Sequence, residues 1–380
     1  KKRLDLFCRN LSTDKDPEHE DDKVIQYLRE ICLDVEWFDA EFSYLKSLKW
    51  NQSKYAYEQI VQAIERFEED EADYFGWNKG YARALKEFKA EAEKYGLRSL
   101  QYDGNVSIVD SIPRRDTHAG FPFIETGLKE KGMYYEDIYQ RYLEMETKAR
   151  KCRSFNEIIL PGSRTQASMP YDKYGRRTGE FKHKTRLVSM ISIWQIIAEL
   201  KTAKRFQMKI GVLDWYAGGK SDERIANIIR RYRRKYRHWL SIDYSAYDQS
   251  ISSWAIHDAF DVIQCAYKHD PNFDEEMFRI IRFDFINKVF IDGDQNPVPI
   301  TKGVPSGSMF TQIIDSIVNR LMITSYMYNI GVEEFDMMIM GDDNLVFTQV
   351  KIDTVDLQGY LDRNFGIEMH PKKCDEGTNK

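Results

Sequence analysis

Three aspartates lie where short apolar segments end, and their side chains could hold metal ions. Asp243 follows the apolar segment at residues 239–242, and Asp342 and Asp343 form a Gly-Asp-Asp turn between two strand-like segments. If these segments are neighbouring strands, Asp243 and Asp342 meet at one end of one sheet. Two such carboxylates would hold two Mg²⁺ ions about 3.5–4 Å apart, with Mn²⁺ as a substitute, and this arrangement serves phosphoryl transfer. Each acid alone is an ordinary turn or cap residue, so the prediction depends on the combination.

Further polar residues could contact the sugar of a bound nucleotide. Asp248 follows Asp243 by five residues, which places it in the next turn. Thr311, Asp315 and Asn319 are four residues apart and therefore share one face of a helix. A polar face on an otherwise apolar helix needs hydrogen-bond partners, and the two hydroxyls of a ribose would supply them. The alternative is that Thr311 and Asn319 bond to neighbouring backbone, and the spacing alone favours neither.

A glycine-containing loop precedes this helix. Gly303 and Gly307 permit a close backbone approach, and a helix N-terminus favours anions. Taken alone, the loop is a helix cap with Ser306 or Ser308 as the first residue.

Two basic segments could contact phosphates. Lys182, Lys184 and Arg186 alternate, so they share one side of an extended segment and could cradle a triphosphate. The alternative is an exposed, charged edge strand. The densest basic run covers residues 230–237; it favours a solvated helix face, with contact to a nucleic-acid backbone as the second interpretation.

The elements that must position these residues change character near Trp239. Before it, helical patterns dominate, with loop-like stretches at residues 101–123 and 161–182. The helical stretches are residues 18–95, 134–154, 194–207 and 222–237. After Trp239 the order is strand, helix, hairpin, long helix, strand, turn and strand. This order predicts antiparallel strands under two helices, the α+β, ferredoxin-like layering.

The composition describes a chain with a real core and excludes several classes of protein. The 380 residues are 42% apolar and carry a formal net charge of −5, which excludes a globally basic nucleic-acid binder but not a basic interior channel. No apolar run reaches the ~18 residues of a membrane-spanning helix. The five cysteines form no CxxC pair, which argues against a disulfide framework or a structural zinc site and favours a reducing compartment. The chain begins at Lys1, as expected of a mature or trimmed piece.

Together these residues resemble a viral RNA-dependent RNA polymerase, because six motifs of that family occur in the family's order. From motif G through F, A, B, C and D, the matching segments are residues 117–122, 182–188, 243–248, 306–319, 341–343 and 365–373. The finer similarity is to polymerases of double-stranded RNA viruses in the partitivirus and picobirnavirus group, with partitivirus preferred. The resemblance covers roughly residues 113–375.

The resemblance implies a right-hand polymerase with mostly helical fingers and a ferredoxin-like (RRM-like) antiparallel palm. Residues 1–112 would form an N-terminal helical extension of the fingers, and residues 113–237 the fingers with the template-guiding loop and the NTP-phosphate segment. Residues 238–380 would form the palm, with a hairpin insert at residues 285–302 that packs with the fingers. Motif E and the thumb are not expected within this sequence.

The resemblance also assigns a role to each motif residue. The metal ligands are Asp243, Asp342 and, as an auxiliary, Asp343, and the general acid for pyrophosphate is Lys373 in preference to Lys372. The implied nucleotide contacts are Lys182, Lys184, Arg186, Asp248, Ser306, Thr311 and Asn319. The implied template contacts are Thr117, Gly120, Pro122, Ser306 and Gly307.

The implied activity is RNA-directed RNA synthesis from NTPs for viral genome replication and transcription. Expected partners are the RNA template and product, NTPs and a viral capsid protein, and the expected location is the virion interior or the host cytoplasm. A reverse transcriptase with the same palm is one alternative, but the pair Asp248 and Asn319 favours ribonucleotides. A catalytically silent RNA-binding or capsid-associated protein of the same shape is another, against which the intact carboxylate set argues.

Overall fold

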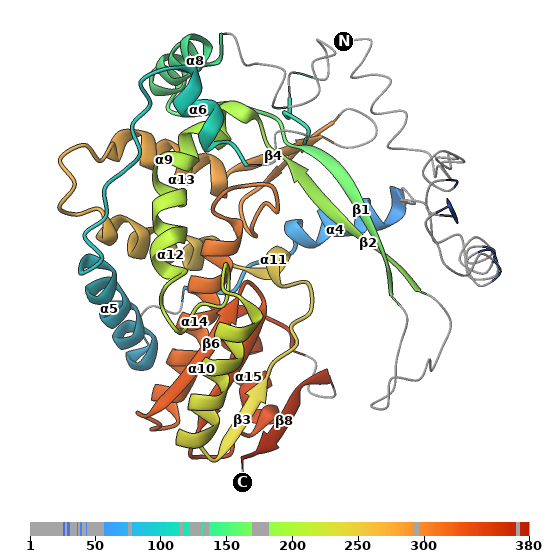
Figure 1. Cartoon of the computed structure of the whole chain (residues 1–380), viewed down its shortest axis with the longest axis vertical. Coiled ribbons are helices and arrows are strands. Elements are labelled where there is room, and N and C mark those ends of the chain that lie inside the picture. Colours follow the sequence, from blue (N-terminus) through green and yellow to red (C-terminus); the bar gives the residue numbers. More distant parts are fainter. Residues whose placement is uncertain are drawn as a thin grey trace. The chain divides into compact units, whose positions relative to one another are not determined.

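The computed structural model describes residues 57–74, 78–113, 117–121, 137–168, 182–291, 296–369 and 373–379, with residues 123 and 131 and a few positions between 26 and 43. The chain divides into two units, whose elements are labelled in Figure 1. The first comprises Lys1–Glu65, Pro161–Val188 and Ile291–Val298. The second comprises Arg66–Leu160, Ser189–Phe290 and Pro299–Lys380. None of the helices in the described segments combines the length and the apolar character needed to cross a membrane.

A four-stranded antiparallel sheet in the second unit carries the predicted catalytic aspartates at its strand ends. The strands lie in the order β6-β7-β3-β8. Their bounds are β3 (His238–Ser241), β6 (Phe335–Met340), β7 (Asp343–Thr348) and β8 (Asp375–Thr378). β3 pairs with both β7 and β8. The strand that precedes Asp243 and the strands that flank the Gly-Asp-Asp turn are therefore neighbours, as the sequence predicted.

One side of this sheet is covered by a group of long helices. α14 (Thr311–Asn329) contacts β6, and α5 (Lys79–Glu93) and α12 (Ser253–Ala266) pack against α14 and each other. α15 (Thr354–Phe365) also contacts α14. The side chains of Ile256, Ala259 and Ile263 are buried in α12, and Phe260 contacts Phe310 at the start of α14 with ring centroids 5.2 Å apart. The layering is α+β, as expected.

Helix α10 (Asp222–Lys235) packs against the sheet through an apolar cluster of its own. Ile228 and Tyr232 of the helix and Tyr236 just after it bury against Met338 and Phe347 of the sheet. The helix begins at Ser221, whose side chain accepts a hydrogen bond from the Arg224 amide, and its last turn is basic, which complements the helix dipole. Figure 1 shows α10 beside the strands of the sheet.

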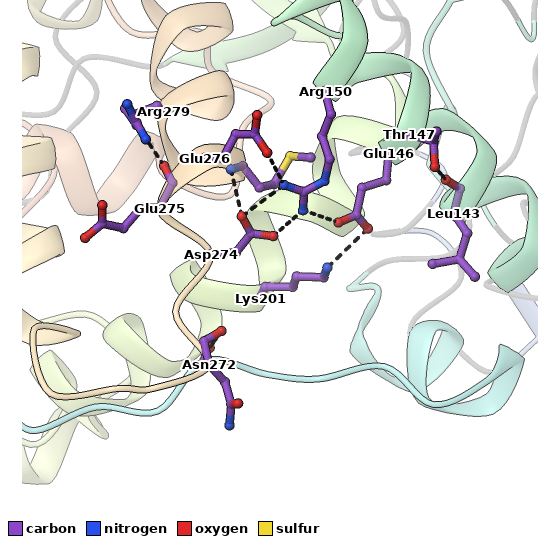
Figure 2. Close-up of polar contacts among 12 residues, drawn as sticks. Leu143, Glu146, Thr147, Arg150, Lys201, Asn272, Asp274, Glu275, Glu276 and Arg279 are labelled. Carbon is purple, nitrogen blue, oxygen red and sulfur yellow. Dashed lines mark hydrogen bonds and ion pairs between the residues drawn. The ribbon is translucent and has the colours of Figure 1, made fainter.

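A second group of helices contains a network of partly buried charged side chains. It consists of α6 (Asn105–Ser111), α8 (Ile138–Cys152), α9 (Ile193–Ile210) and α13 (Glu275–Ile286). Figure 2 shows Arg150 of α8 between Glu146 of the same helix and Asp274 and Glu276 at the start of α13. Lys201 of α9 bonds to Glu146 at 3.3 Å. The network ties three helices together.

The remaining described elements are short. They are α4 (Tyr57–Glu68), α11 (Tyr247–Ser250) and two-stranded sheets formed by β1 (Leu160–Ser168) with β2 (Lys182–Met190) and by β4 (Lys288–Ile291) with β5 (Pro297–Ile300). Within residues 285–302, β4 pairs with β5, and the hairpin insert that packs with the fingers stays a prediction.

Two local expectations were wrong. Residues 160–168 form strand β1, where the sequence predicted a loop; Pro161 and Gly162 are common in loops, and a partner strand about 20 residues away overrides that local signal. Residues 105–111 form the short helix α6 inside the predicted loop 101–123. The three-part division into extension, fingers and palm stays a prediction.

Candidate active site

The strand register brings the three predicted catalytic aspartates to one end of the sheet. Ser241 of β3 lies opposite Leu345 of β7, and the same antiparallel register continued by two residues places Asp243 opposite Asp343. The Ile242 amide donates to the Asn344 Oδ1 at 3.3 Å, which supports this continuation. Asp342 occupies the turn between β6 and β7, because Met340 pairs with Asp343. All three aspartates are exposed to solvent.

The Gly-Asp-Asp turn is held by helix α14. Gly341 has φ = +67°, a conformation that glycine adopts most readily, and its amide donates to the Ser316 Oγ at 2.8 Å. The Asn319 Nδ2 donates to the carbonyls of Gly341 (3.0 Å) and Asp342 (3.2 Å), and the Asn319 Oδ1 accepts from the Tyr244 hydroxyl at 3.0 Å. The Asn319 side chain is fully buried and its donors and acceptor are satisfied. The backbone-bonding alternative is thus the one its geometry favours.

Asp315 lies on the polar helix face that the sequence predicted, and its side chain is buried, which the sequence did not reveal. It is 4% exposed, and its Oδ1 has no hydrogen-bond partner. Burial raises the pKa of Asp315 well above its ordinary value, and the nearby charges of Asp248 and Asp342 raise it further. The only sequence signal was its place between Thr311 and Asn319 on the polar face of the helix. The structure therefore brings Asp248, Asp315 and Asp342 into one electrostatic environment.

The loop before α14 is clamped on two sides. The Ser306 Oγ accepts a hydrogen bond from the Ser189 amide at 3.0 Å. A Cβ on Gly307 would lie 1.8 Å from the Ser189 carbonyl oxygen, so only glycine fits there. Thr311 donates its hydroxyl to the Pro305 carbonyl at 2.6 Å. The hydroxyls of Ser306 and Thr311 thus hold the shape of the loop that was predicted to contact the nucleotide.

Glu199 of α9 forms the other side of this clamp, which the sequence did not reveal. Its Oε2 accepts from the Ser308 hydroxyl and from the Met309 amide, each at 2.8 Å, and its Oε1 accepts from the Gln195 Nε2 at 3.0 Å. The side chain is fully buried. Burial raises the pKa of Glu199 to about 7, although the three hydrogen bonds favour the carboxylate. A single Glu in an apolar helix gives no sequence signal for contacts more than 100 residues away.

The predicted motif-D segment lies next to the strand of Asp243. The Ser245 amide donates to the Glu368 carbonyl at 2.9 Å, and Tyr244 bridges to Met369. Ser241 pairs with Asp375, and Lys373 lies two residues before the start of β8. Lys373 is exposed, whereas Lys372 lies outside the described residues.

The predicted template and triphosphate residues are placed in part. Gly120 has φ = +82° and packs against the backbone of Ile191 and Ser192. Thr117, three residues earlier, is half-buried. Pro122 is not among the described residues. Residues 182, 184 and 186 lie in strand β2, which confirms the extended segment. Arg186 is exposed. These three residues belong to the first unit, whereas the aspartates belong to the second.

The donor set of this site suits a hard divalent cation. Exposed carboxylates at strand ends offer oxygen ligands, and Mg²⁺ takes one or two such groups together with waters and substrate phosphates. Within the described residues, no group of three or more His, Cys, Asp or Glu side chains is arranged to hold a metal ion by itself. The residues therefore fit an ion that arrives with a phosphate-bearing substrate.

A comparison with known protein families identifies the chain. The profile described as "Viral RNA-dependent RNA polymerase" matches residues 41–380. This match spans most of the chain and contains the sheet, its aspartates, the clamped loop and strand β2. The chain therefore belongs to the viral RNA-dependent RNA polymerases, and it is a nucleotidyltransferase that synthesises RNA on an RNA template.

Proposed function

We propose that the aspartates at the strand ends catalyse RNA synthesis by two-metal nucleotidyl transfer. The 3′-hydroxyl of the growing RNA attacks the α-phosphorus of an NTP, so a new O–P bond forms, the bond to the β-phosphate breaks, and pyrophosphate leaves. The observation that carries this proposal is the antiparallel register of β3 with β7, which aligns Asp243 with Asp343 beside Asp342 in the turn. Bound Mg²⁺ would lower the pKa of the attacking hydroxyl and neutralise charge on the phosphates.

The protein residues have separable tasks in this reaction. Asp243 and Asp342 would hold the ions, with Asp343 as the auxiliary ligand. Asn319 and Ser316 fix the turn that carries Asp342 through their bonds to Gly341 and Asp342. Holding these carboxylates in place before substrate binds reduces the reorganisation that the transition state requires.

Asp248 and Asp315 are the acids that we assign to the ribose. Asp315 has a buried oxygen without a partner, and a buried polar atom is costly unless something bonds to it. A sugar hydroxyl beside Asp248 would supply that bond. Asn319, the earlier candidate, already has its bonds within the protein, so its contact with the sugar stays a prediction with less support.

Lysine and arginine side chains would contact the triphosphate and assist the departure of pyrophosphate. Lys182, Lys184 and Arg186 would neutralise the triphosphate, because alternate residues of an extended segment are expected on one side of it. Lys373 would donate the proton to pyrophosphate in preference to Lys372, and its place two residues before β8, a neighbour of β3, is compatible with this role. Thr117, Gly120, Pro122, Ser306 and Gly307 would guide the template.

The biological setting follows from the resemblance and is part of the proposal. The enzyme would copy the genome of a double-stranded RNA virus of the partitivirus or picobirnavirus group, inside the virion or in the host cytoplasm. A viral capsid protein would be its partner. The right-hand arrangement of fingers and palm and the use of Mg²⁺ or Mn²⁺ belong to the same proposal.

Primer extension tests this function directly. The wild-type chain should extend an RNA primer on an RNA template with NTPs only when Mg²⁺ is present. Asp342→Asn should keep the fold, because the side chain is exposed, but should abolish extension, since metal affinity falls when the charge is removed. Extension with dNTPs in preference to NTPs would support the reverse-transcriptase alternative, and metal-independent RNA binding without extension would support the silent one. Normal incorporation by Asp342→Asn would refute the assignment of Asp342.

A further inference from the structure

Helix α10 carries two rows of cations, and one row is already neutralised by the protein. Arg231 and Lys235 lie four residues apart on the same helix face. Arg231 pairs with Asp214, and Lys235 pairs with Glu334 at 3.3 Å and Asp336 at 3.1 Å. The charges of this row are compensated within the fold.

The other row has no such compensation. We call the following residues the arginine stripe: Arg230, Arg233, Arg234 and Arg237. The first three share a helix face by their spacing of three and four residues, and the fourth follows the helix end. Arg230 and Arg233 donate only to the neutral amide oxygens of Asn227 (2.7 Å) and Asn379 (2.8 Å). In the part of the chain that the structure describes, no carboxylate lies within ion-pair distance of any of the four.

Some exposed cations elsewhere in the second unit are paired with acids, unlike this row. Arg83 bonds to Glu87 and Glu333, and Lys268 bonds to Glu93. The chain has 61 acidic against 56 basic residues, so acids are in excess. Like charges at a spacing of four residues on a helix repel. The arginine stripe therefore concentrates positive charge that is not paired with the acidic residues of this chain, although these are in excess.

We propose that the arginine stripe is a second RNA-binding surface, which holds the phosphate backbone of the template or the product outside the catalytic site. The apolar side of α10 is buried against the sheet, so the stripe faces solvent. The large exposed apolar side chains of the described residues do not include any on α10, whereas a protein interface would need an apolar centre. Arginine forks match phosphate oxygens, and RNA is the polymer that this family handles.

The last residue of the stripe, Arg237, and the catalytic aspartates lie at opposite ends of β3. Tyr236 and Arg237 directly precede His238, the first residue of β3, whereas Asp243 follows its other end. Five residues of extended chain span about 17 Å. An RNA that engages both places must therefore be longer than one that fills only the catalytic site. The inference rests on membership of the polymerase family and does not require the two-metal mechanism.

The test compares two double variants of α10 that remove equal charge. Arg230→Gln with Arg234→Gln removes two residues of the stripe, and Arg231→Gln with Lys235→Gln removes the compensated row. Binding of a short and a long single-stranded RNA is measured without metal over a series of salt concentrations. Each lost phosphate contact should weaken binding of the long RNA roughly 5-fold at ~0.1 M salt and should reduce the salt slope by about 0.7. The stripe variant should show this loss, the control variant much less, and short-RNA binding should stay at the wild-type level in both.

Three results would overturn the proposal. If the stripe variant binds long RNA as tightly as the wild type does, the arginine stripe is only a solvated helix face. If both variants lose the same affinity for long RNA, the loss reflects the total charge of the protein and not the stripe. Loss of binding to poly-glutamate with unchanged RNA binding would identify a surface for an acidic protein. Melting temperatures of both variants exclude misfolding. Because binding is measured without metal, failure of the two-metal mechanism would appear only in the primer-extension experiment.

Discussion

Asn319 and Asp315 lie one helical turn apart on α14, but they differ in their hydrogen-bond partners, which indicates different roles. Asn319 holds the turn of Asp342 through two donated hydrogen bonds. Asp315 has an unpartnered buried oxygen near Asp248. A polymerase that retains such an acid accepts a cost in stability, because an unpartnered buried polar atom costs about 1–3 kcal/mol. Such a cost is expected where a ligand later supplies the bond.

Asp315→Ala should therefore reduce discrimination between NTP and dNTP without lowering the free energy of unfolding. We expect the ratio of kcat/KM for GTP and dGTP to fall at least about 10-fold, because the site loses a group that bonds the 2′-hydroxyl. The free energy of unfolding should stay the same or rise, since a buried unpartnered acid is removed. Steady-state kinetics and denaturant unfolding measure the two effects.

Asn319→Ala is the matched control for that experiment. It should lower kcat for GTP and dGTP by similar factors, because the turn that carries Asp342 loses its brace. If Asp315→Ala keeps the wild-type ratio of kcat/KM for GTP and dGTP, Asp315 does not contact the sugar. A changed ratio in the Asn319 variant alone would return the sugar contact to Asn319.

At the scale of elements, Glu199 couples α9 to the loop that begins α14. Its carboxyl group accepts from Ser308 and Met309 and is buried, so its pKa lies near 7. Between about pH 4.5 and 7 the unfolded chain releases this proton while the folded chain keeps it. Stability must then fall as the pH rises through that window, by about 3 kcal/mol at 1.36 kcal/mol per pH unit.

Glu199→Gln should remove this pH dependence. Glutamine is neutral at every pH, so the slope of the unfolding free energy between about pH 4.5 and 7 should become less negative. Denaturant unfolding at several pH values measures it. Glu91→Gln is the control, because the pKa of Glu91 is shifted in the opposite direction. Burial raises the pKa of Glu91, but hydrogen bonds from Arg320 outweigh burial and lower it. An unchanged slope in Glu199→Gln would mean that Glu199 is ionised throughout.

The same elements show what the sequence can and cannot reveal. The strand before Asp243, the Gly-Asp-Asp turn and the helix from Thr311 follow from local patterns, because each is set by neighbours a few residues away. Strand β1 does not, since its partner β2 supplies the pairing. Glu199 was missed for a related reason: its partners Ser308 and Met309 lie far along the chain. Asp315 stood on the predicted polar face, but burial and a missing partner are properties of the folded state.

At the scale of the whole molecule, each of the two units carries its own set of the predicted site residues. The aspartates, the clamped loop and Lys373 belong to the second unit, and β2 with Arg186 belongs to the first. Within the second unit, helices far from the aspartates still bear on the site. α9 reaches the loop before α14 through Glu199, and Lys201 of the same helix joins the Arg150 network with α8 and α13. The stability of that network therefore bears on the geometry of the loop.

Arg150→Ala should destabilise the second unit more than the loss of an ordinary surface ion pair. Arg150 bonds to Glu146 at 2.7 Å, to Glu276 at 2.8 Å and to Asp274, and its side chain is 30% exposed. Its removal leaves Glu146 and Asp274 partly buried with fewer partners, so we expect a loss of about 2–3 kcal/mol in the free energy of unfolding. Arg83→Ala is the matched control, because Arg83 also bonds two carboxylates but is 46% exposed, so its loss should change the free energy of unfolding much less. Equal losses in the two variants would show that the network is no more than a surface ion pair and that α8, α9 and α13 are held together by apolar packing alone.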